Sequence, residues 1–120
     1  SYGYQFVSDR PMKIAVVGIG YADGVPRQLS NRLQVLIKGQ RACQIGAITM
    51  DQLMLDVSHL RHLKVGDTVT LIGQDGNQEI TANHWATMLG TISWEILCGF
   101  KHRLPRIKKK SAQLTSEVKI

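Results

Sequence analysis

Short apolar runs alternate with glycine- and aspartate-rich turns over the first two thirds of the chain. The first run, residues 12–20 (MKIAVVGIG), is rich in β-branched side chains and ends at glycines, which is typical of a buried strand. Asp23-Gly24 and Pro26 then mark a turn, followed by a polar loop to Asn31. We expect strands over residues 12–20, 34–37, 42–45, 46–56, 68–72 and 78–80, with an irregularity near residue 50.

The clearest hairpin signal, Asp75-Gly76-Asn77, joins the last two of these runs. After residue 80 the pattern changes to a helical one. Thr81 can cap a short helix over residues 82–89, Gly90 stands at its expected end, and a second helical turn can follow at 93–97. The fold class is therefore all-β: a small barrel or sandwich of short, mostly antiparallel strands with one short helix near residues 82–89.

Two segments near the end of the chain carry weaker signals. Residues 104–107 (LPRI) predict an edge strand, because Pro105 cannot donate a hydrogen bond within a central ladder. Residues 111–120 are polar with scattered apolar positions, and we expect them to form a flexible tail.

Length and composition fit one folded domain, with 120 residues, 43% hydrophobic and 20% charged. No apolar run approaches the roughly 18 residues that a membrane-spanning helix needs, and no signal peptide opens the chain, so we expect no membrane partner. Cys43 and Cys98 have no metal-site spacing and predict two buried thiols in a reducing cytoplasm, with no metal bound. The chain opens at Ser1 rather than Met, so we expect it to be part of a longer polypeptide.

The net charge of +6 raises nucleic-acid binding as an alternative function. Six of the basic residues lie within residues 101–110, and the remaining nine balance the nine acidic residues. The segment also lacks the aromatic side chains that single-strand binders place beside their basic residues. We interpret it as a solvated surface and expect no nucleic-acid partner.

General motifs of catalysis and nucleotide binding do not identify a function. The pair Gly18 and Gly20 resembles the start of a dinucleotide fingerprint but lacks the third glycine and the helix. Tyrosines beside glycines, at residues 1–4 and 20–24, fit either phenols that point into a cavity or aromatic side chains at a barrel rim. Polar residues 49–52 within an apolar run fit either an interface or a bulge.

Taken together, six ordered blocks resemble one family, the alanine racemases. The blocks are residues 1–4 (SYGY), 20–24 (GYADG) with Arg27, 48–52 (ITMDQ), 65–67 with 69–73, 91–98 (TISWEILC) and 103–107 (RLPRI). The resemblance implies that residues 1–110 form the carboxy-terminal β-domain of such an enzyme. It also implies an amino-terminal (β/α)8 barrel that holds pyridoxal phosphate on a lysine, which is absent from this chain. Two subunits of the homodimer would then combine one barrel and the partner's β-domain in each active site.

The resemblance also implies roles for individual residues. Tyr2 matches the tyrosine that, together with the cofactor lysine, transfers protons on an amino acid bound to pyridoxal phosphate, so L-alanine and D-alanine interconvert. Met50 and Tyr21 match residues that face the small amino-acid substrate. Arg27, Arg106, Ala47 and Ile92 match the access corridor. Without the lysine and the cofactor pocket, we expect this chain alone to bind no cofactor and to be inactive.

Two positions depart from the family pattern. Trp94 stands where many members have a tyrosine whose hydroxyl helps to hold the cofactor phosphate; an indole offers one N–H donor and no acceptor, so that contact is altered or lost. Ala47 stands where some members have arginine. The residues that would sense a substrate hydroxyl lie largely on the missing barrel, so a serine racemase of the same family stays open as an alternative.

Overall fold

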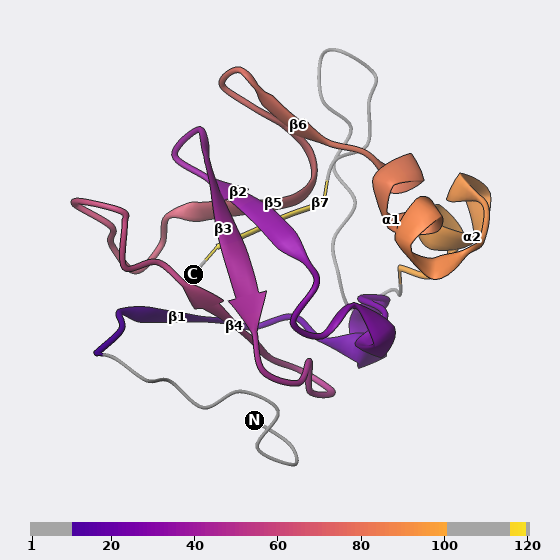
Figure 1. Ribbon diagram of the computed structural model, residues 1–120, viewed down its shortest axis with the longest axis horizontal. Helices are drawn as coiled ribbons and strands as arrows, with labels where there is room; N and C mark the ends of the chain where they lie inside the picture. The colour runs from indigo at the N-terminus through magenta and orange to yellow at the C-terminus, as the bar shows by residue number, and fades with distance from the viewer. Residues whose placement is uncertain (1–10, 101–115, 120) are drawn as a thin grey trace.

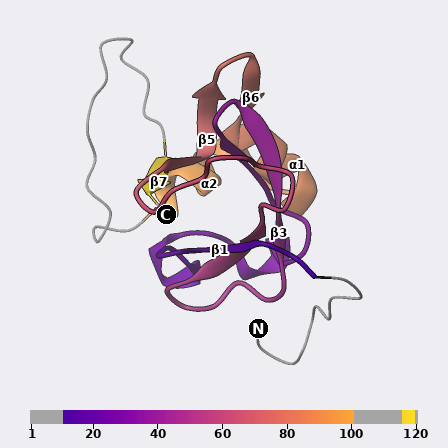
Figure 2. The same cartoon turned by 90° about the vertical axis from the view of Figure 1, so that its left-hand side faces the viewer.

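Seven short strands form one antiparallel sheet within residues 11–100 and 116–119, the part of the chain that the computed structural model describes. Their order is β1-β4-β3-β2-β5-β6, and β7 pairs with β5 beside this path. The strands are β1 (Ile14–Val17), β2 (Gln34–Ile37), β3 (Gln40–Ile45), β4 (Leu53–Asp56), β5 (Thr68–Asp75), β6 (Gln78–Ile80) and β7 (Ser116–Lys119). The sheet curves so that β1 lies apart from β5 and β7 in both views (Figures 1 and 2). The expected class, short and mostly antiparallel strands, is confirmed.

Side-chain alternation decides which face of each strand enters the core. In β1, Ala15 and Val17 are buried whereas Ile14 and Val16 are exposed, as expected for a strand with one solvated face. β2 lies between β3 and β5 and buries three successive residues, 35–37. A central strand covered on both faces reads as a continuous apolar run for this reason.

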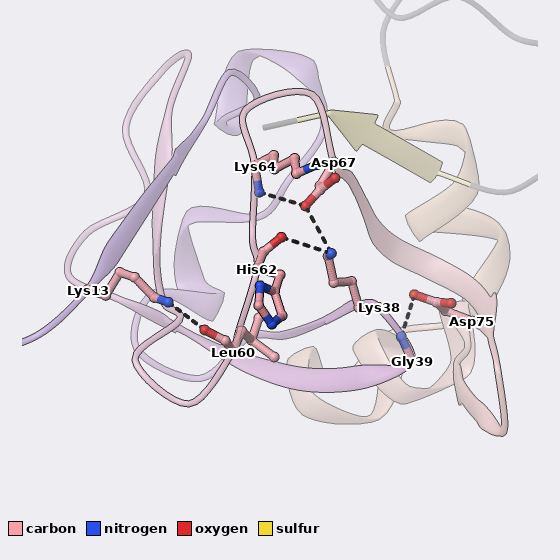
Figure 3. A network of polar contacts seen from close by, with 8 residues as sticks. All are labelled: Lys13, Lys38, Gly39, Leu60, His62, Lys64, Asp67 and Asp75. Carbon is pink, nitrogen blue, oxygen red and sulfur yellow. Dashed lines mark hydrogen bonds and ion pairs between the residues drawn. The ribbon is translucent and has the colours of Figure 1, made fainter.

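Two hairpin turns meet at their tips. Lys38 and Gly39, between β2 and β3, both have positive φ, which is the geometry of the tight two-residue turn that hairpins favour. The predicted turn at Gly76 and Asn77 joins β5 to β6 and confirms the hairpin. The Asp75 carboxylate accepts the Gly39 N–H at 3.0 Å, so one side chain connects the two turns (Figure 3).

Two short helices cover one end of the sheet (Figure 1). Helix α1 (Ala82–Leu89) begins at Thr81, whose hydroxyl accepts the His84 N–H at 3.1 Å, and ends at Gly90 with a left-handed backbone, as predicted. Trp85 of α1 is fully buried, with its ring centroid 6.0 Å from that of Phe100. The second helical turn is present as α2 (Ser93–Cys98).

A polar network holds the long connection between β4 and β5 (Figure 3). The Lys38 ammonium donates to the His62 carbonyl at 3.0 Å and lies 3.7 Å from the Asp67 carboxylate. Asp67 also accepts the Lys64 N–H at 2.8 Å, and Lys13 donates to the carbonyl of Leu60. These contacts tie the connection to the β2–β3 hairpin and to the residue before β1.

Several expectations differ from the observed structure. The expected strand over residues 12–20 is only four residues long in β1, because the chain turns at Gly18 and winds into two 3-10 helices, η2 (Tyr21–Asp23) and η3 (Arg27–Leu29), where a loop was expected. Residues 46–52 are not extended as a strand, and only β4 remains of that run.

Two further observations concern the expected tail and the cysteines. Within the expected tail, Ser116–Lys119 form β7, which pairs with β5; the other residues of 111–120 lie outside the described residues, and the flexible tail stays a prediction. Cys43 and Cys98 are exposed rather than buried: Cys43 lies on the outer face of β3 and Cys98 ends α2. The predicted edge strand at residues 104–107 lies outside the described residues.

Candidate functional site

The segment Gly20–Gly24 folds into a tight turn, named here the 20–24 turn. Gly20 has an extended backbone, Tyr21–Asp23 form η2, and Gly24 has a left-handed backbone with φ 112°. The Asp23 carboxylate accepts the Gly20 N–H at 3.1 Å, and the Asp23 N–H donates to the Gly20 carbonyl at 3.0 Å. A carboxylate three residues after the start of a helix closes the first turn in this way.

Residues 49–52 form a second tight turn, named here the 49–52 loop. The Thr49 N–H donates to the Gln52 carbonyl at 3.0 Å, and the Thr49 hydroxyl accepts the Gln52 N–H at 3.1 Å. These two bonds leave Met50 and Asp51 at the tip, and Met50 is 52% exposed. Side-chain bonds of this kind explain why polar residues interrupt the apolar run.

Backbone hydrogen bonds join the 20–24 turn to the 49–52 loop. The Tyr21 N–H donates to the Thr49 carbonyl at 2.9 Å, and the Ala22 N–H donates to the Met50 carbonyl at 3.0 Å. A Cβ at Gly20 would lie 2.1 Å from the Thr49 oxygen, so only glycine permits this approach. The structure therefore brings together Tyr21 and Met50, two of the residues predicted to face the substrate.

The base of the 49–52 loop is fixed from the other side. The Ile48 N–H donates to the Ser30 hydroxyl at 2.9 Å, and the Gly46 N–H donates to the Asn31 side chain at 2.6 Å. Gln44, 1% exposed, accepts the Asn31 N–H at 2.8 Å. Gly46 and Ile48, which lead to the 49–52 loop, are thus held by partly buried hydrogen bonds, and this favours one conformation of the segment over many.

Helix α2 approaches the same region through a second glycine contact. A Cβ at Gly24 would lie 2.5 Å from the Gly99 carbonyl oxygen at the end of α2. Ile92 and Trp94, at the start of α2, are 65% and 72% exposed. Trp94 is therefore largely exposed to solvent in this chain.

Exposed apolar side chains concentrate in these three segments. Among the described residues, eight large hydrophobic side chains are exposed, and five of them come from the 20–24 turn, the 49–52 loop and α2 with its preceding residue. They are named here the apolar group: Tyr21, Met50, Ile92, Trp94 and Leu97. Such clustering is typical of a surface that contacts a partner or a ligand.

Of the predicted site residues that remain, the structure describes Arg27 and Ala47. The Arg27 guanidinium lies 5.8 Å from the centre of the Tyr21 ring, close enough for a cation–π contact. Ala47 is 1% exposed, so its methyl group packs in the core of this chain, and a role in the access corridor stays a prediction. Tyr2 and Arg106 lie outside the described residues, as does the basic segment 101–110.

Sequence reasoning missed Asp23 as a member of this site. The sequence indicated only a turn at Asp23, whereas the structure buries this residue to 1% exposure. The signal in the sequence was the spacing between Gly20 and Asp23, because an acidic residue at this distance can bond to the N–H that starts a helix. A cavity of about 360 Å³ lies elsewhere, between α1 and strands β2, β3 and β6, and none of the predicted site residues lines it.

Comparisons with known proteins agree with the resemblance. The family model for the alanine racemase C-terminal domain matches residues 1–108. The alanine racemase of Synechocystis sp. is 70% identical over 107 residues, which is 89% of this chain and 29% of that protein. The alanine racemase of Clostridium perfringens is 45% identical over 118 residues, 98% of this chain and 31% of that protein. The chain thus spans about three tenths of the length of these relatives.

Solved structures give the same result. The crystal structure of Bacillus anthracis alanine racemase with bound L-Ala-P matches 99% of this chain and 30% of its own, with a TM-score of 0.85 and 35% identity. Bartonella henselae alanine racemase with covalently bound pyridoxal phosphate matches 88% of this chain and 29% of its own, with a TM-score of 0.79 and 36% identity. No helix among the described residues is long and apolar enough to cross a membrane. The chain belongs to the alanine racemase family, of which it carries the carboxy-terminal domain.

Proposed function

We propose that this domain takes part in the interconversion of L-alanine and D-alanine, joined to an amino-terminal barrel that holds pyridoxal phosphate. In a homodimer it would complete the active site of the partner subunit. The observation that carries the proposal is the junction of the 20–24 turn and the 49–52 loop, in a chain whose residues 1–108 match the family. The whole enzyme's activity is proposed, because the chain spans only part of its relatives.

The backbone of Met50 supports a role in binding the substrate. Its N–H has no hydrogen-bond acceptor among the residues that the structure describes, whereas its carbonyl is held by Ala22. Met50 is half exposed at the tip of the loop, and we propose that its N–H is open to an incoming group. We propose that it donates to the carboxylate of the amino acid, since a charged acceptor gives a stronger bond than a neutral one.

The fit of the cofactor to this chain is limited. The apolar group offers one phenol and one indole, and its neighbour Arg27 offers a cation beside the Tyr21 ring. This set lacks the several donors that a phosphate group requires, so at most Trp94 would touch the cofactor, through its single N–H. Pyridoxal phosphate held on the barrel would supply an electron sink for the electron pair left at the substrate α-carbon.

We propose that Tyr2 holds and moves one of the two protons. Inverting the α-carbon requires a proton to leave one face and another to arrive at the opposite face, so two groups are needed. The Tyr2 phenol would serve one face, from across the subunit boundary. A free phenol has a pKa of about 10, so this role needs positive charge or hydrogen-bond donors on the barrel to lower it.

The test uses the polypeptide that joins this domain to its barrel. Replacing Tyr2 by Phe should lower the racemisation rate by roughly 10²–10⁴-fold, the range expected for loss of an acid–base group, while the cofactor absorbance is unchanged. Tyr4 lies two residues further along the same segment and is assigned no role in the site, so Tyr4→Phe is the matched control and should retain the wild-type rate. A Tyr2→Phe variant with near-wild-type turnover would remove the proposed role. Comparing the racemisation rates of the wild-type enzyme on alanine and on serine shows which of the two is the preferred substrate.

A further inference from the structure

Asp23 stands out because its carboxylate is buried away from the surface where chemistry would take place. Within the described residues, the buried polar side chains are Asp23, Gln44 and Thr70. A buried carboxylate is costly unless hydrogen bonds compensate for the lost water, and Asp23 accepts the Gly20 N–H at 3.1 Å. The side chain and the backbone of the same residue therefore both close the 20–24 turn.

Closing the turn determines where two backbone donors point. With Gly20 and Asp23 joined, the N–H groups of Tyr21 and Ala22 lie outside the ring of the turn and donate to the Thr49 and Met50 carbonyls at 2.9 and 3.0 Å. Gly20 allows the close contact, since any side chain there would collide with the 49–52 loop. The loop is thus held by donors whose direction depends on Asp23.

The geometry of a peptide group carries this effect to the proposed substrate donor. The Thr49 carbonyl and the Met50 N–H belong to one trans peptide group, in which the two bonds point in opposite directions. The bond from the Tyr21 N–H to the Thr49 oxygen therefore fixes the direction of the Met50 N–H on the far side of that group. Donation to the carbonyl also polarises the peptide and strengthens its N–H as a donor.

We infer that Asp23 is a positioning residue: it closes the 20–24 turn so that Tyr21 holds the Thr49–Met50 peptide with its free N–H aimed at the carboxylate of the substrate. The inference rests on the proposed function for its last step only. The earlier steps concern this chain alone and are measurable without substrate.

The first arm of the test uses the 120-residue chain. In Asp23→Ala, the amide hydrogens of Tyr21 and Ala22 should exchange faster with solvent, and the NMR resonance of the Met50 amide should move. Asp23→Asn keeps an oxygen that can accept the Gly20 N–H and should restore both signals. If the alanine variant does not fold, Asp23→Ser is measured in its place. The serine side chain is one bond shorter than that of aspartate, so its hydroxyl does not reach the Gly20 N–H.

The chain offers a matched control in Asp67. It closes residues 64–67 with the same pair of bonds, accepting the Lys64 N–H at 2.8 Å and donating its own N–H to the Lys64 carbonyl at 3.0 Å. Asp67→Ala therefore removes the same kind of contact from the connection between β4 and β5 (Figure 3). It should leave the signals of Tyr21, Ala22 and Met50 unchanged.

The second arm uses the polypeptide that includes the barrel. Asp23→Ala should raise the KM for alanine about tenfold with a smaller change in kcat, as expected when a hydrogen bond to a charged substrate group is weakened. Asp23→Asn should return KM towards the wild-type value. Unchanged amide signals in Asp23→Ala, or a fall in kcat at constant KM, would overturn the inference. If the amide signals move in Asp23→Ala but the wild-type enzyme does not racemise alanine, the proposed function is contradicted and the positioning role of Asp23 within this chain is not.

Discussion

A methyl group added at Gly20 would meet very different surroundings from one added at Gly18. At Gly20 it would lie 2.1 Å from the Thr49 oxygen, whereas at Gly18 nothing lies within 4 Å. We predict that Gly20→Ala lowers the free energy of unfolding by about 1–3 kcal/mol, as forced overpacking does, and Gly18→Ala by much less. Urea denaturation of the two variants measures the difference. Equal stabilities would mean that the 20–24 turn and the 49–52 loop separate easily.

Individual site residues were only partly accessible to sequence reasoning. The resemblance pointed to Tyr21 and Met50, and the structure places them side by side. Which atoms connect them could not be derived, because the bonds are between backbone groups about 28 residues apart and carry no side-chain signature. Asp23 was missed for a related reason: a turn-forming aspartate and a buried aspartate that fixes a turn have the same local sequence.

At the scale of elements, α1 depends on its first turn. The Thr81 hydroxyl accepts the His84 N–H, and the His84 ring accepts the Thr81 N–H at 3.0 Å, so each residue satisfies the other. We predict that Thr81→Ala lowers the free energy of unfolding by about 1 kcal/mol, the usual cost of losing a cap. Thr87→Ala, at an exposed position within the same helix, should leave the free energy of unfolding unchanged or raise it slightly. Thermal denaturation of both variants measures the difference in stability. Equal losses of stability would contradict a capping role for Thr81.

Elements with strong local signals were predicted well, and those that depend on tertiary contacts were not. The hairpin at Gly76 and the helix from Thr81 to Gly90 follow from turn and cap chemistry that acts over a few residues. The 3-10 helices η2 and η3 occur where glycine and proline indicate only a turn. β7 is short and polar, and it is a strand because β5 offers it an edge. The outward direction of Cys43 likewise follows from its register in β3.

For the molecule as a whole, the exposed apolar side chains divide into those of the apolar group and those of other parts of the described surface. β1 exposes Ile14 and Val16 at one edge of the sheet, and Val65 is 93% exposed in the connection before β5. The apolar group instead combines three segments that backbone contacts hold together at Gly20 and Gly24. A surface built from rigidly joined segments loses little conformational entropy on binding, which favours a docking face over an accidental patch.

The same apolar group predicts how the 120-residue chain behaves on its own. Apolar surface that a partner would cover favours contact with a second copy when no partner is present, so we predict concentration-dependent self-association in sedimentation experiments. Trp94→Glu should weaken it, because the charge disrupts the apolar group and an acidic residue suits the first turn of α2. Val65→Glu changes a side chain of even greater exposure away from that group and should not. A wild-type chain that stays monomeric at every concentration, or equal effects of the two substitutions, would show that the group does not act as an interface.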